Sequence, residues 1–117
     1  MEERAVVVVA SPSDGIHTQL RLTLGQERFE VVEAEGADSA TELVATRQPS
    51  LVVVDADLEG ATELATSVRT RSNGVRVLVL AARDRDVDEL VREADATVGL
   101  PVTSFALLRR IEEVLAK

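Results

Sequence analysis

The chain has 117 residues, the size of one domain, and its 13 basic and 21 acidic side chains leave a net charge of −8 at pH 7. This acidic balance argues against direct nucleic-acid binding and against docking on anionic membranes, because both need basic surfaces. The absence of cysteine excludes disulfides and thiolate metal centres, and a single histidine excludes any site with two histidine ligands. We expect one domain over residues 1–117 in the cytoplasm, since the sequence contains neither a long apolar run nor a signal-peptide pattern.

Five short apolar runs rich in valine and leucine predict β-strands. They cover residues 6–9, 29–32, 51–54, 75–82 and 97–100. Such runs lack the polar alternation of a half-exposed strand, and they are typical of strands covered on both faces. They therefore favour a parallel sheet.

Helical periodicity fills the segments between these strands. The first predicted helix is capped by Ser13 and carries Ile16, Leu20 and Leu24 on one face. Further helices are predicted over residues 38–47, 61–71 and 86–94. The last helix is capped by Thr103 or Ser104, and its predicted inner stripe is Phe105, Leu108, Ile111 and Leu115. Alternating strands and helices predict an α/β fold with helices on both faces of the sheet.

Asp55 is the most prominent candidate for a functional side chain. It directly follows a predicted central strand, and aspartate is disfavoured within strands. Reactive groups in open parallel sheets gather at the carboxyl ends of the strands, which is where Asp55 would lie. The alternative interpretation is that Asp55 only begins a turn.

Taken together, residues 4–117 resemble the receiver domain of bacterial response regulators. Residues 51–58 are similar to the family's third strand, which ends in the phosphoacceptor aspartate, here Asp55. Residues 29–36, 76–83 and 93–101 are similar to the second strand, the fourth strand and the run into the fifth, in the family's order. The resemblance implies a flavodoxin-like, doubly wound sheet of five parallel strands in the order 2-1-3-4-5 with five helices, and it implies that Asp55 lies beside the end of the first strand.

The remaining site positions depart from the family pattern. Receivers usually end the first strand with two acidic residues that hold Mg²⁺, whereas this chain has Ala10 and Ser11. The hydroxyl residue usual at the end of the fourth strand is Ala81, and the usual lysine before the fifth-strand proline is Leu100. The aromatic residue usual in the fifth strand is Thr97. The resemblance therefore implies a degenerate phosphorylation site.

This degeneracy predicts weak or no Mg²⁺ binding at Asp55 and Asp57. Divalent ions need several hard oxygen ligands, and one carboxylate with a backbone carbonyl near Asp57 and the Ser11 hydroxyl forms a poor set. Without the lysine, no evident cation pairs with phosphoryl oxygens. Arg83 would replace it only if its loop folded back, and we expect Arg83 to be exposed. No cofactor is expected, except Mg²⁺ if the site is functional.

Two further expectations concern the surface. The resemblance implies a partner-binding face formed by the fourth helix, the fifth strand and the fifth helix, and its candidate residues are Thr97, Val102, Leu107, Arg109 and Arg110. The first helix is the competing surface, because Leu22 lies off its apolar stripe. His17, the single histidine, is expected on the helix surface.

Three functions remain open from the sequence. The favoured one is a pseudo-receiver of a two-component phosphorelay, which is not an enzyme and acts through a histidine kinase, a downstream effector or a second copy of itself. The second is a functional receiver that a histidine kinase phosphorylates on Asp55. The third is a small flavodoxin-like ligand-binding domain or enzyme, which is disfavoured because the strand ends carry few polar residues.

Overall fold

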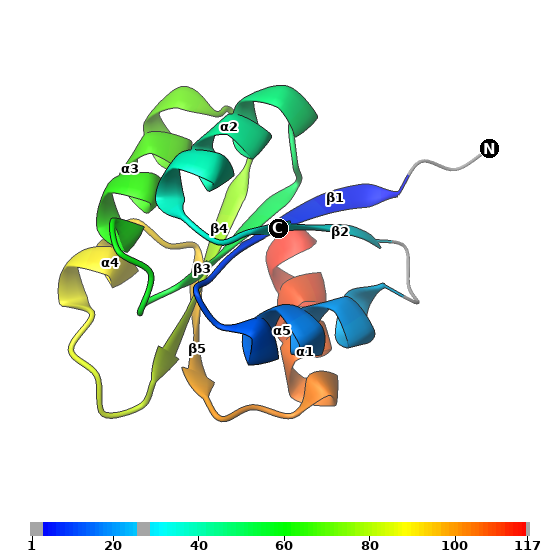
Figure 1. Ribbon diagram of the computed structural model, residues 1–117. Helices are drawn as coiled ribbons and strands as arrows, with labels where there is room; N and C mark the ends of the chain where they lie inside the picture. The colour runs from blue at the N-terminus through cyan, green and yellow to red at the C-terminus, as the bar shows by residue number, and fades with distance from the viewer. Residues whose placement is uncertain (1–3, 26–28, 117) are drawn as a thin grey trace.

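The computed structural model describes residues 4–25 and 29–116, which form one five-stranded parallel sheet with helices on both faces (Figure 1). The strands lie in the order β2-β1-β3-β4-β5, as predicted. Their bounds are Ala5–Ala10 for β1, Phe29–Ala34 for β2, Leu51–Asp55 for β3, Arg76–Ala82 for β4 and Ala96–Leu100 for β5. The helices are α1 (Asp14–Leu24), α2 (Ala37–Arg47), α3 (Ala61–Arg71), α4 (Asp88–Arg92) and α5 (Ser104–Leu115).

The sheet divides the core into two apolar layers. Val8, Val52 and Val54 pack with α2, α3 and α4 on one face. Val7 and Val53 point to the other face, which α1 and α5 cover. Successive side chains of a strand point to opposite faces, so a strand covered on both sides must be apolar at every position. This requirement explains the unbroken valine runs of β1 and β3 and confirms the parallel sheet predicted from them.

The inner stripe predicted for α5 is partly wrong. The buried residues are Leu107, Ile111 and Val114, whereas Phe105 is 76% exposed. The Thr103 hydroxyl accepts a hydrogen bond from the Ala106 amide and fixes where the helix begins. The sheet meets the side of α5 that carries residues 107, 111 and 114. Of the predicted stripe, Ile111 is buried, Leu108 and Leu115 are partly buried against the same core, and Phe105 faces solvent.

The α4 helix is shorter than predicted. It covers Asp88–Arg92 instead of residues 86–94, and Val91 is exposed while Leu90 is buried. Within the described ranges, no helix has the length and apolar character needed to span a membrane.

Candidate functional site

Asp55 lies at the carboxyl end of β3, where β3 sits between β1 and β4 (Figure 1). Parallel pairing places Val54 beside Ala10 of β1 and Asp55 beside Leu80 of β4. The chain leaves β1 towards α1 on one face of the sheet and leaves β3 towards α3 on the other. Asp55 therefore occupies the point where the connections diverge, which is the usual location of sites in open α/β sheets.

The Asp55 carboxylate is buried and hydrogen-bonded by its own chain. Its exposed fraction is only 3%. The Ser11 hydroxyl donates to Oδ2 at 2.7 Å, and the Asp57 backbone amide donates to Oδ1 at 2.9 Å. A buried carboxylate is tolerated when hydrogen bonds replace its hydration, and Asp55 meets this condition without an external ligand.

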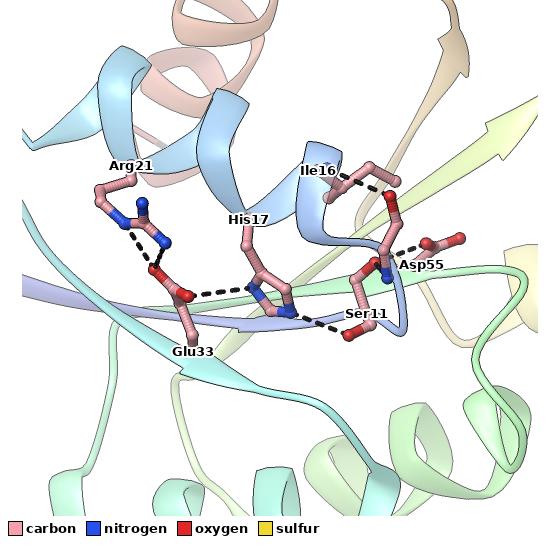
Figure 2. Close-up of polar contacts among 7 residues, drawn as sticks. Ser11, Ile16, His17, Arg21, Glu33 and Asp55 are labelled. Carbon is pink, nitrogen blue, oxygen red and sulfur yellow. Dashed lines mark hydrogen bonds and ion pairs between the residues drawn. The ribbon is translucent and has the colours of Figure 1, made fainter.

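Ser11 connects Asp55 to three other segments. Its amide donates to the Ala34 carbonyl of β2 at 3.1 Å, and its hydroxyl accepts from the Ser13 amide at 3.0 Å. Its carbonyl oxygen lies 2.8 Å from His17 Nε2 (Figure 2). The Ser11 amide, hydroxyl and carbonyl all have partners although the residue is fully buried.

His17 is buried with an exposed fraction of 3%, so the prediction that it lies on the helix surface is wrong. Residues 17, 20 and 24 are spaced as a helical stripe, and they are the buried residues of α1. This spacing was the available sequence signal for the burial of His17. Because the ring projects under the helix, it reaches the end of β1 instead of solvent.

The other ring nitrogen of His17 faces Glu33 of β2, which forms an ion pair with Arg21 of α1 (Figure 2). Nδ1 lies 3.8 Å from Glu33 Oε1, beyond hydrogen-bond distance, and it has no hydrogen-bond partner. Arg21 donates to Glu33 Oε2 from Nε at 2.7 Å and approaches it with Nη2 at 2.6 Å. Since His17 contacts the Ser11 carbonyl and not its hydroxyl, the geometry is not that of a serine hydrolase triad.

The two arginines of the β4–α4 loop point to different partners. Arg85 forms an ion pair with the exposed Asp57 carboxylate. The side chain of Arg83 lies over Gly99 of β5, where an added Cβ would come within 2.8 Å of Arg83 Cγ. The Arg83 guanidinium donates to the Pro101 carbonyl at 3.3 Å. Arg83 is exposed, as expected, and it is turned towards the end of β5.

The residues at this end of the sheet do not fit the Mg²⁺ ion that the receiver fold implies. Ala10 has no ligand atom in its side chain, and the Ser11 hydroxyl gives its hydrogen to Asp55. The Asp57 carboxylate is paired with Arg85, a cation that competes with a metal ion. Over residues 4–25 and 29–116, no group of three or more histidine, aspartate or glutamate side chains is placed to hold a metal.

Two other family site positions also lack polar side chains. Ala81 ends the buried part of β4, and Leu100 is half-buried at the end of β5. Neither side chain has a polar group for a phosphoryl oxygen.

A groove of about 650 Å³ opens beside the site and is acidic. Its charged lining residues are Glu35, Asp38, Asp57 and Glu59. Although Arg85 pairs with Asp57, the acidic lining disfavours an anionic ligand, and the net charge of −8 adds to this effect.

The candidate interface residues differ widely in exposure. Arg109 is exposed, and Thr97, Val102 and Arg110 are half-buried. Leu107 was a candidate for the interface on the expectation that it is partly exposed, but it is fully buried, so that expectation is wrong. The reason is the position of α5 on the sheet, which turns Leu107 into the core and Phe105 to solvent. Among the described residues, the exposed large apolar side chains are Leu22, Val91 and Phe105.

Comparison with solved structures shows the fold of response-regulator receiver domains. A response regulator from Thermotoga maritima aligns with a TM-score of 0.87 and 23% identity, over 97% of this chain and 99% of that one. A signal receiver domain from Bermanella marisrubri aligns with a TM-score of 0.85 and 20% identity, over 96% and 98% of the two chains. The receiver domain of a Francisella response regulator aligns with a TM-score of 0.80 and 19% identity, over 97% and 98%.

No protein-family model matches the sequence, and no curated protein matches it either. The structural likeness, at these identities, is a likeness of fold. Because one fold hosts many functions, the function has to be argued from the residues at the site.

Proposed function

We propose that this chain is a signalling module of the two-component type that acts through protein–protein contacts, with weak or no Mg²⁺-dependent phosphorylation at Asp55. Its partner would be a histidine kinase, a downstream effector or a second copy of the chain. The observation that carries the proposal is the Asp55 carboxylate, which is buried and bonded on both oxygens by Ser11 and Asp57.

Phosphorylation of Asp55 would require a phosphodonor to reach one of these oxygens. The donor would have to displace the Ser11 hydroxyl or the Asp57 amide, next to a groove lined by acidic residues. Transfer between two anions depends on positive charge that neutralises the developing charge. Arg85 contacts Asp57, two residues from Asp55, but it is already paired with the Asp57 carboxylate. These features favour the pseudo-receiver over the functional receiver.

The decisive experiment is incubation with a small acyl phosphate and Mg²⁺ followed by intact mass measurement. We expect at most a trace of phosphoryl adduct on the wild-type chain. Asp55→Asn is the matched control, since it keeps the size of the side chain and replaces the nucleophilic carboxylate by an amide. An adduct on most of the wild-type molecules that is absent from Asp55→Asn would overturn the proposal and support the functional receiver.

The same site argues against the third possibility, a small-molecule enzyme or ligand-binding domain. A ligand pocket needs a few convergent polar groups that are free to bind. At the carboxyl end of this sheet, the buried polar side chains are already engaged within the chain: the Ser11 hydroxyl bonds to Asp55, and the His17 ring contacts the Ser11 carbonyl. A non-enzymatic role is therefore part of the proposal, and a cytoplasmic location stays a prediction.

A further inference from the structure

We infer that changes in the position and hydrogen bonding of the Asp55 carboxylate are transmitted to α1, through Ser11 and through His17 Nε2, which contacts Ser11. They are not transmitted to the face formed by α4, β5 and α5. This coupling goes beyond the proposed function, because it holds whether or not Asp55 is phosphorylated. The contacts that carry it lie in one buried chain from β3 to α1 (Figure 2).

The first link is the Ser11 hydroxyl, which bonds on two sides at once. It donates to Asp55 Oδ2 at 2.7 Å and accepts from the Ser13 amide at 3.0 Å. Ser13 is the N-cap of α1, since its own hydroxyl accepts from the Ile16 amide. Any movement of the Asp55 carboxylate therefore reorients a hydroxyl that also holds the first turn of α1.

The second link is the Ser11 carbonyl. A carbonyl oxygen only accepts hydrogen bonds, so the 2.8 Å contact requires the hydrogen to be on His17 Nε2. The opposite nitrogen, Nδ1, has no hydrogen-bond partner and faces Glu33 at 3.8 Å. The imidazole is thus hydrogen-bonded on its Ser11 side alone, and a shift of the Ser11 backbone is expected to move the ring and the helix that carries it.

The alternative route from Asp55 leads towards α4 and is weaker. It runs from the Asp57 amide through the Asp57 carboxylate to Arg85. The side chains of Arg85 and Asp57 are 46% and 65% exposed, and exposed ion pairs are screened by water and salt. The end of β4 offers no polar side chain to Asp55, because Ala81 lies there, and the link on that side is the backbone hydrogen bond from the Ala56 amide to the Leu80 carbonyl at 2.8 Å. Buried hydrogen bonds are more strongly coupled than an exposed ion pair, which favours α1 as the element that senses Asp55.

NMR chemical shifts test this coupling, because His17 is the only histidine and its ring nitrogens give an unambiguous signal. Asp55→Ala is expected to shift the His17 ring ¹⁵N resonances and the amides of the first turns of α1. The amides of α4, β5 and α5 are expected to shift several times less. Native-state shifts report local structure, so a general loss of stability does not imitate this pattern. Asp55→Asn, which keeps the size of the side chain, is measured as well in case Asp55→Ala does not fold.

Two background variants identify the route. In Ser11→Ala, adding Asp55→Ala is expected to leave the His17 ring signals unchanged, because the connecting hydroxyl is already absent. Thr23→Val is the control, since Thr23 ties α1 to Ser104 of α5 by a hydrogen bond that does not lead to Asp55. In that background, Asp55→Ala is expected to shift the ring as in the wild type.

Two results would overturn the coupling. One is a response of β5 and α5 to Asp55→Ala that exceeds the response of α1. The other is an Asp55→Ala effect on the His17 ring that persists in full without the Ser11 hydroxyl. Neither result depends on phosphodonor, so the phosphorylation experiment can fail or succeed independently of this one.

Discussion

Replacing Ser11 by alanine removes the hydroxyl that joins the ends of β1 and β3, and its cost follows from the contacts at that atom. The variant keeps the Cβ, so little packing is lost. It loses a buried hydrogen bond to the Asp55 carboxylate and another from the Ser13 amide. A hydrogen bond to a charged group contributes about 1.5–3 kcal/mol and a neutral one about 1 kcal/mol. We therefore expect the free energy of unfolding to fall by about 2.5–4 kcal/mol.

Urea denaturation followed by circular dichroism measures this loss, since the chain has no tryptophan or tyrosine for fluorescence. The midpoint is expected to fall at an unchanged slope. For a domain of 117 residues, the same change lowers the melting temperature by about 10–16 °C. The control is Thr46→Ala, which removes an exposed hydroxyl bonded to the Glu42 carbonyl and is expected to change stability by less than about 0.5 kcal/mol.

A loss below about 1 kcal/mol for Ser11→Ala would refute this reasoning. It would mean that water or another donor satisfies the Asp55 carboxylate as well as the serine does. Asp55 would then be more accessible than its exposed fraction of 3% indicates. The proposal that the chain's own groups satisfy the Asp55 carboxylate would lose its support.

Three other predictions concern metal binding, the partner surface and the backbone. Titration with millimolar Mg²⁺ is expected to cause little saturable change in the NMR chemical shifts around Asp55, because one carboxylate poorly offsets the dehydration of the ion. Tight binding with localised shift changes would contradict this prediction. Charge reversal at Arg109 and Arg110 is expected to weaken self-association or partner capture if the α5 face is the interface, as sedimentation or pull-down would measure, and unchanged binding would exclude that face. Gly60→Ala is expected to cost about 1 kcal/mol in thermal unfolding, because Gly60 has a φ of 83° and an added Cβ would lie 3.3 Å from a neighbouring side chain. Gly36→Ala is its control, since φ there is −143° and a Cβ meets nothing within 4 Å, so an equal loss in both variants would argue against backbone strain.

The sequence by itself determined the sheet and the place of Asp55. Unbroken valine runs fit only strands covered on both faces, and their alternation with helical segments leaves few possible topologies. The position of an aspartate after a buried run then follows from chain order alone. The departures from the receiver pattern at Ala10, Ala81 and Leu100 could also be recognised from the sequence, because each of these residues lacks the functional group usual at its position, whatever the surrounding geometry.

Only the tertiary structure decided which helix residues face the sheet and which side chains meet at its edge. Helical periodicity leaves the orientation of a short helix uncertain by one position, and that uncertainty separates the predicted inner residue Leu108, which is half-buried, from the fully buried Leu107. The Ser11–Asp55 hydrogen bond joins residues 44 positions apart, so it depends on the register of β1 against β3. The spacing of residues 17, 20 and 24 could have indicated that His17 is buried, but its contact with Ser11 depends on how α1 packs against the sheet, which is set by the summed packing of both elements.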